Sequence, residues 1–120
     1  EQFGKKISEF QTMQFKIADM VTELIAARTM TRLAASKLDK NDSEATIYSA
    51  MAKRFATDVG FNVCNEALQI FGGYGYIQEY PLERYVRDVR VHQILEGTNE
   101  IMKMIIGRRM IMEDAASIIQ

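Results

Sequence analysis

The sequence lacks several residue types, and each absence excludes a kind of site. It has 120 residues with no tryptophan, one proline, one cysteine (Cys64) and one histidine (His92). A single cysteine excludes an internal disulfide and fits a reducing compartment. Because Cys64 and His92 have no recognisable ligand spacing, we expect no metal site. No serine–histidine catalytic pattern accompanies His92.

Charge imbalance and long hydrophobic runs are also absent. The chain has 15 basic and 16 acidic residues, with a net charge of −1, and so lacks the basic face that nucleic acids or anionic membranes attract. No apolar run approaches the roughly 18 residues of a membrane-spanning helix. Apolar residues make up 48 %, enough for one domain with one core. The sequence opens without methionine, and we expect it to be a piece of a longer protein.

The hydrophobic pattern predicts an all-α fold, an antiparallel bundle with two long helices, one short helix and a C-terminal helix. The long helices are expected at about 7–39 and 43–71, and the second is apolar over a wide arc, which favours a central position. Asn41 and Glu44 resemble a capping box before the second helix. Steps of three and four mark one face of the first helix, at Ile7, Phe10, Gln14, Ile17, Val21 and Leu24, with Met13, Met20 and Ile25 flanking it.

Turn and cap residues divide the remaining sequence. Gly72 and Gly73 are expected to end the second helix, and Pro81 to begin a short helix over about 81–88. Thr98 is a good N-cap for a last helix over about 99–117. The non-helical segment before it presents Glu96. That carboxylate is either an ordinary charge near a helix start or, if its surroundings exclude water, a general base.

Two other stretches have ordinary structural explanations. The run from Gly72 to Gly75 follows a helix, whereas the dinucleotide fingerprint follows a strand, so the motif alone indicates a helix stop. The charged residues Arg87, Asp88 and Arg90 are typical of a solvated or salt-bridged surface. We expect them to help fix the segment before Glu96.

Read together, several stretches resemble the C-terminal helical domain of the flavin-dependent acyl-CoA dehydrogenases. They are residues 2–5, 10–11, 15–20, 68–76, 80–81, 87–88 and 94–100, in order and at natural spacing. Gly-Tyr-Gly-Tyr and Val-His-Gln-Ile-Leu-Glu-Gly look most like the isobutyryl-CoA (short branched-chain) branch. The resemblance implies that residues 1–120 form a single helical domain. The family's N-terminal helical domain, its middle β domain and the first helix of this domain would then lie outside the sequence.

The resemblance also implies roles for individual residues. Glu96 matches the family's catalytic base, which removes the α-proton of a thioester, while Gly97 and Arg108 match substrate-side positions. The segment from Gln69 to Gly73 matches one that contacts FAD in a neighbouring subunit. The positions that match FAD contacts are Gln2, Phe3, Gln11, Gln69, Ile70, Phe71, Gly72, Gly73, Thr98 and Glu100.

By resemblance, the intact protein is expected to dehydrogenate a short or branched acyl-CoA with FAD and to pass electrons to an electron-transferring flavoprotein. A homo-oligomer (dimer or tetramer) is implied, in the mitochondrial matrix or the bacterial cytoplasm. The chain alone is expected to be inactive. Two alternatives stay open, namely a non-catalytic helical oligomerisation module and an acyl-CoA oxidase-like relative. Glu96, rather than an aspartate, disfavours a nitroalkane oxidase.

Overall fold

The computed structural model describes residues 1–112 and 115–120, and those residues form a helical bundle as predicted. Its long helices are α1 (Gln11–Asp39) and α2 (Ala45–Phe71), followed by α4 (Leu82–His92) and α5 (Asn99–Met112). Three short elements complete the order, the 3-10 helices η1 (Ile7–Glu9) and η2 (Ala115–Ile119) and the single turn α3 (Gly73–Tyr76). No strand occurs in this part of the chain, although Gln2 and Lys5 form an isolated bridge.

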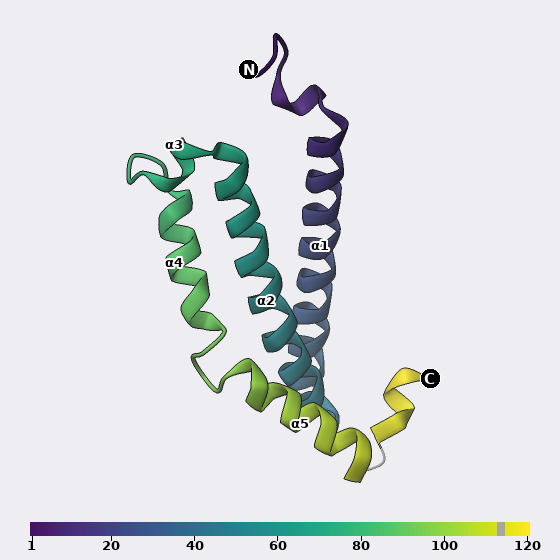
Figure 1. Ribbon diagram of the computed structural model, residues 1–120. Coiled ribbons are helices and arrows are strands. Elements are labelled where there is room, and N and C mark those ends of the chain that lie inside the picture. Colours follow the sequence, from purple (N-terminus) through teal and green to yellow (C-terminus); the bar gives the residue numbers. More distant parts are fainter. Residues whose placement is uncertain (113–114) are drawn as a thin grey trace.

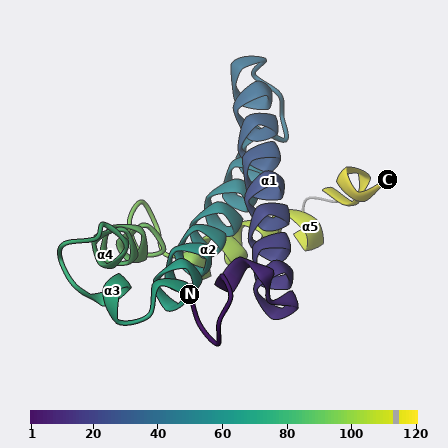
Figure 2. The same cartoon turned by 90° about the horizontal axis from the view of Figure 1, so that it is seen from above.

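Helix α2 is central, as its apolar composition predicts. It runs antiparallel to α1 on one side and contacts α4 on the other, and α5 crosses near its N-terminal half (Figure 1). The view from above places α1 and α4 on opposite sides of α2 (Figure 2). The molecule is elongated, at 58 × 29 × 25 Å. None of the helices described is long and apolar enough to cross a membrane.

The contact between α1 and α2 uses small residues. Ala27 and Ala34 of α1 are buried, at a seven-residue step that continues the spacing of the half-buried Met13 and Met20. Such a step keeps one seam of a helix facing its partner. On α2, Ile47 is the one large side chain that is fully buried among the described residues. The remaining buried apolar residues of α2 are Ala45, Ala50, Ala52 and Val59.

The predicted buried face of α1 is only partly confirmed. Ile7 and Phe10 are half-buried, whereas Ile17, Val21 and Leu24 are 45 %, 52 % and 41 % exposed. The more buried positions are those of the adjacent seam, at Met13, Met20, Ala27 and Ala34. Helix α1 is apolar on two faces, and periodicity cannot tell which of them packs against α2. The start of this helix also differs, since Phe10 is extended (φ −81°, ψ 130°) and its ring packs edge-on against Phe3. The α-helix therefore begins at Gln11.

The predicted capping box at Asn41 is also wrong. Asn41 has φ +53° and ends α1, with its N–H donating to Leu38 and the N–H of Asp42 donating to Lys37. This pair of bonds is a Schellman motif, in which the left-handed residue is usually glycine or asparagine. Asp42 orders the turn before α2 instead, because its Oδ1 accepts the backbone N–H of Glu44 at 2.8 Å.

Acid should weaken the turn between α1 and α2. The Glu44 N–H, followed by the Lys37 ammonium at 3.2 Å, lowers the pKa of Asp42 below its ordinary value. A carboxyl with a depressed pKa in the folded state contributes stability above its unfolded pKa, and that contribution is lost as pH falls through the folded pKa. Asp42→Ala should therefore destabilise the chain at neutral pH and flatten the acid limb of its stability curve. Urea denaturation between neutral pH and pH 2 measures both effects, and an unchanged acid limb would contradict this account.

The boundaries of the last two helices differ from the prediction. Helix α4 begins at Leu82, directly after Pro81, but continues four residues beyond 88 to His92. The ion pairs Arg87–Glu83 at 2.9 Å and Arg84–Asp88 at 3.6 Å lie within the part of this helix that was predicted. Arg87 and Asp88 therefore pair within α4, whereas Arg90 lies over the Phe61 ring of α2, 5.9 Å from its centroid, and lines a cavity beside the segment before Glu96. Helix α5 is described to Met112, and residues 115–119 form a 3-10 helix rather than a continuation to 117.

Gly60 is expected to limit the stability of α2. It lies within the helix, and a Cβ built on it would meet nothing within 4 Å. Gly60→Ala should raise the free energy of unfolding by about 0.5–1 kcal/mol, because alanine loses less backbone entropy in a helix. Gly75→Ala is the contrasting variant, since its Cβ would lie 2.5 Å from the Leu68 carbonyl oxygen. Thermal unfolding compares the two, and a destabilising Gly60→Ala would show that Gly60 is needed for close packing.

Candidate active site

The segment of residues 93–98, here called the bridge, connects α4 to α5 and presents Glu96. Glu96 has φ +58° and Gly97 has φ +91°, so two consecutive residues are left-handed. The N–H of Asn99 donates to the Gln93 carbonyl at 3.0 Å and closes the bridge. A left-handed residue other than glycine costs about 1–2 kcal/mol, so surrounding contacts must stabilise this conformation of Glu96.

The positive φ of Gly97 favours glycine beside Glu96. A Cβ at this position would lie 2.8 Å from the Cε of Met102, and the backbone φ already disfavours a side chain. The side chain of Glu96 is exposed to solvent in the chain as described. The bridge therefore fixes the backbone on both sides of the carboxylate and leaves the carboxylate itself open to a ligand.

Lys53 of α2 forms two hydrogen bonds that connect α2 to the bridge and to the start of α5. Its ammonium donates to the Gly97 carbonyl and to Oδ1 of Asn99, both at 2.7 Å. Hydrogen bonds from a charged donor are stronger than neutral ones. Sequence analysis did not identify Lys53. The available signal was a cationic side chain on a helix predicted to be central, where a charge needs a polar partner.

Asp58, about one turn further along α2, accepts hydrogen bonds from the amide side chains at the two ends of the bridge. Its Oδ1 accepts from Nδ2 of Asn99 and from Nε2 of Gln93, both at 2.7 Å. Asn99 also donates to Oγ1 of Thr57 at 2.9 Å and is 6 % exposed, the one buried polar side chain in the described part of the chain. The amide of Asn99 therefore connects the Lys53 ammonium to the Asp58 carboxylate. Asn99 and Asp58 were also missed by sequence analysis.

Thr98 and Glu100 lie at the start of α5, and Thr98 is the N-cap as predicted. Its Oγ1 accepts the N–H of Ile101 at 3.4 Å. Both residues line a cavity of about 150 Å³, together with Asp58, Arg90 and Asn99. A helix N-terminus with its cap favours negatively charged groups, although Glu100 places a carboxylate in the same region.

Residues near the N-terminus and residues at the end of α2 together line a second cavity, of about 390 Å³. Gln2 and Phe3 line it together with Gln69 and Ile70 at the end of α2. The N-terminal turn that presents Phe3 has φ +53° there and +79° at Gly4, and Phe3 is 93 % exposed. The structure thus brings together four of the residues that were predicted to contact FAD. Gln11 is exposed at the first position of α1 and is not among the residues lining this cavity.

The end of α2 exposes its backbone. Gly72 has φ +60° and ends the helix as predicted, and a Cβ at Gly72 or Gly73 would meet nothing within 4 Å. Phe71 is 49 % exposed and its ring lies 6.1 Å from that of Tyr80. These residues leave open space in which a planar or phosphate-bearing group can approach the main chain.

The predicted residues fall into groups that one copy of the chain does not bring together. The bridge is anchored to α2 at Lys53 and Asp58, whereas the FAD-contact residues of α2 begin at Gln69. Asp58 and Gln69 are about 16 Å apart along the helix axis, at 1.5 Å per residue. Arg108 lies further along α5, exposed, beside a small cavity of about 80 Å³.

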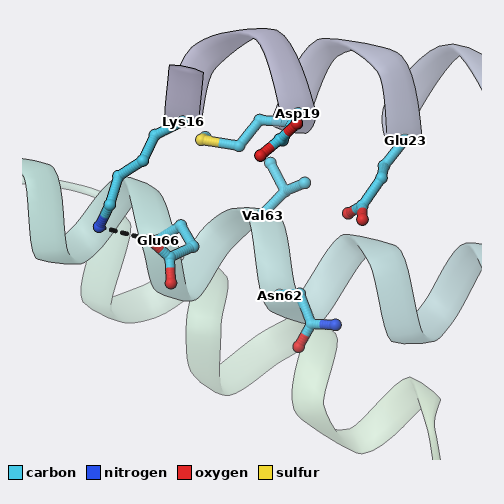
Figure 3. Close-up of a pocket in the computed structure, with 7 residues that line it drawn as sticks. Lys16, Asp19, Glu23, Asn62, Val63 and Glu66 are labelled. Atoms are coloured by element: carbon cyan, nitrogen blue, oxygen red, sulfur yellow. Dashed lines mark hydrogen bonds and ion pairs between the residues drawn. The ribbon is translucent and has the colours of Figure 1, made fainter. Parts of the chain in front are cut away.

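A third cavity, of about 360 Å³, lies between α1 and α2 and contains none of the predicted residues. Lys16 pairs with Glu66 across it at 3.0 Å, and Asp19 and Glu23 extend from α1 on the same side (Figure 3). The described residues contain no cluster of three metal-ligating side chains. Cys64 is half-buried nearby in α2, and burial raises the pKa of its thiol.

Comparison with known proteins identifies the class that this fold and bridge define. Residues 1–111 match the family model of the acyl-CoA dehydrogenase C-terminal domain. The chain therefore belongs to the acyl-CoA dehydrogenase family, as its C-terminal domain.

Three individual proteins show which members of the family this chain is similar to. The mitochondrial isobutyryl-CoA dehydrogenase of Dictyostelium discoideum is 52 % identical over 114 residues, which are 95 % of this chain and 27 % of that protein. The structure of butyryl-CoA dehydrogenase from Megasphaera elsdenii matches with a TM-score of 0.88 at 45 % identity, over 92 % of this chain and 28 % of that one. A chain of PigA, solved as an FAD complex, matches with a TM-score of 0.87 at 34 % identity, over 92 % and 28 %. The chain thus spans about a quarter of the length of these proteins.

Proposed function

We propose that this chain serves as the C-terminal part of an FAD-dependent acyl-CoA dehydrogenase, with Glu96 as the base. The observation that carries the proposal is the left-handed turn at Glu96 and Gly97, closed by Asn99 and bonded to Lys53. Strained backbone conformations that many contacts maintain are concentrated at functional sites. Here the strained backbone is that of Glu96, the residue that matches the family's base.

The chemistry requires a base that is dry and well placed. The α-proton of a thioester is weakly acidic, so the carboxylate of Glu96 must lie close to it while hydrogen bonds stabilise the enolate oxygen. The backbone N–H of Glu96 is the donor proposed for the thioester oxygen. Gly97 leaves room beside the base, and its missing Cβ avoids Met102. FAD, when bound, supplies the acceptor for the hydride that leaves the β-carbon.

The two cavities fit different parts of FAD. The apolar one beside Gln2, Phe3 and Gln69, with exposed glycine backbone after α2, suits the pyrophosphate side. The polar one at Thr98 and Glu100, at a helix N-terminus, suits the adenosine end. By resemblance, the segment from Gln69 to Gly73 would lie against FAD of a neighbouring subunit, and the separation of about 16 Å along α2 is consistent with that arrangement. A homo-oligomer, dimeric or tetrameric, is therefore part of the proposal.

Substrate, acceptor and location are proposed from the relatives. Similarity to isobutyryl-CoA dehydrogenase favours a short branched acyl-CoA. The match, at 46 % identity, to a solved structure described as an electron transferring flavoprotein of Acidaminococcus fermentans favours such a flavoprotein as the electron acceptor. Relatives described as mitochondrial favour the mitochondrial matrix, and bacterial relatives the cytoplasm of a bacterium. The family's N-terminal helical domain, middle β domain and preceding helix would supply the rest of the site.

One observation favours a second function, that of a helical assembly module without catalysis. Ile17, Val21 and Leu24 form an exposed apolar band on α1, which is larger than isolated surface residues require. Such a band would be covered by another helix or another copy. The two functions exclude each other at Glu96, so turnover of an acyl-CoA by the full-length flavoprotein distinguishes them.

The chain alone should not catalyse dehydrogenation, even when FAD is added. Glu96 is exposed, and a hydrated carboxylate is too weak a base for a thioester α-proton. Isobutyryl-CoA with an artificial electron-accepting dye measures this directly. Dye reduction above the rate without protein would show that the 120 residues contain a complete site. Sedimentation with FAD, followed at protein and flavin wavelengths, shows in the same sample whether the chain assembles and whether flavin travels with it.

A further inference from the structure

We infer that Lys53 is a positioning residue for Glu96 and that it acts through the backbone of the bridge. The inference rests on the proposed role of Glu96 as the base. The hydrogen bonds of the Lys53 ammonium do not go to the Glu96 carboxylate. It donates instead to the carbonyl of the next residue, Gly97, and to the side chain of Asn99, each at 2.7 Å.

The position of the bond explains how it would act. The Gly97 carbonyl belongs to the second of two left-handed residues, and its orientation follows from the φ values of +58° and +91°. An ordinary extended or helical backbone at Glu96 would turn this carbonyl away from α2 and break the bond to Lys53. The bond therefore favours the one backbone conformation in which the Glu96 side chain projects from the bridge as observed.

The other end of the bridge is held in the same way. Gln93, the first residue of the bridge, and Asn99, which directly follows the bridge, both donate to Oδ1 of Asp58 at 2.7 Å. Lys53 and Asp58 lie on successive turns of α2, and Asn99 accepts from one and donates to the other. In this network each of the polar groups named has a partner, and a satisfied network of this kind specifies a single arrangement of the segment that it holds.

Placement matters because proton abstraction depends steeply on distance. A displacement of about 1 Å at a reacting group can cost about 10²-fold in rate. Loss of the Lys53 ammonium would free the Gly97 carbonyl and allow Glu96 to occupy several positions. Substrate binding should change less than the rate, because the Glu96 N–H is one contact to the thioester, whereas proton abstraction depends directly on the position of the Glu96 carboxylate.

The test uses the flavin-loaded full-length dehydrogenase that contains this chain, with isobutyryl-CoA as substrate and rates expressed per bound flavin. Lys53→Met should lower kcat about 10- to 100-fold, while KM changes less than about threefold. The isotope effect with α-deuterated substrate should rise, because proton abstraction becomes slower than the other steps. Lys53→Arg, which retains a charged donor, should recover part of the rate. Lys103→Met, at an exposed lysine of α5, is the matched control and should match wild type.

A role confined to folding would lower the yield of holoenzyme without changing the rate or isotope effect per flavin. A kcat within twofold of wild type in Lys53→Met holoenzyme overturns the inference. If that variant gives no folded holoenzyme, Lys53→Gln, which keeps a polar side chain but removes the ammonium, decides the question. For that variant a kcat fall of more than twofold supports the inference, and a smaller change overturns it. Failure of the proposed function itself looks different, since wild type would then be inactive or Glu96→Gln would retain full activity.

Discussion

Replacing Glu96 by glutamine in the full-length flavoprotein should reduce kcat by about 10²- to 10⁴-fold, the usual contribution of a positioned general base. Glutamine has nearly the same shape and keeps the backbone N–H at residue 96. Binding of the acyl-CoA should therefore persist, with KM or the measured Kd close to wild type. Steady-state turnover of isobutyryl-CoA and spectral titration of the bound flavin measure the two quantities separately.

The control for this variant is an exposed glutamate outside the bridge. Glu79, in the loop between α3 and α4, is exposed, and Glu79→Gln should leave turnover unchanged. Turnover of Glu96→Gln within tenfold of wild type would end the assignment of Glu96 as the base. Loss of activity in both variants would point to a general effect of surface charge instead.

Asn99→Ala should produce the largest loss of stability among substitutions at the bridge. Its side chain is 6 % exposed and bonds to the Lys53 ammonium, the Asp58 carboxylate and the Thr57 hydroxyl. Because hydrogen bonds to charged groups contribute about 1.5–3 kcal/mol, and the abandoned groups lose their partner, the free energy of unfolding should fall by about 3 kcal/mol. Urea denaturation followed by circular dichroism measures the change in the 120-residue chain.

Asn65→Ala is the matched control for that measurement. Asn65 lies on an exposed position of α2, so its replacement should change the free energy of unfolding by no more than about 0.5 kcal/mol. A loss below about 1 kcal/mol for Asn99→Ala would show that the bridge does not depend on its hydrogen bonds to α2. The network around Lys53 would then be incidental to the position of Glu96.

Local signals predicted those parts of the fold that depend on local chemistry. The stop at Gly72, the cap at Thr98 and the central place of α2 are confirmed because each follows from a few neighbouring residues or from composition. The exposed face of α1 was not predictable, since both of its faces are apolar. Asn41 was misread because asparagine serves equally at a helix start and at a left-handed helix end.

The site divides in the same way. The bridge and its glutamate were found because their residues are adjacent in sequence. Lys53 and Asp58 were missed because their partners are more than 30 positions away, at Gln93, Gly97 and Asn99. By pattern alone, charged residues on a helix are expected to be solvated, and only the packing of α5 against α2 reveals the partly buried polar network.

The most direct test of the account is rapid anaerobic mixing of the full-length flavoprotein with isobutyryl-CoA, with the oxidised flavin absorbance followed over time. We expect the absorbance to fall in wild type, and to fall at least about 100-fold more slowly in Glu96→Gln, which binds the same thioester. That pair of results would establish that this domain supplies the base for dehydrogenation. Flavin that is reduced equally fast in both proteins, or is not reduced by any short or branched acyl-CoA in wild type, would contradict the account.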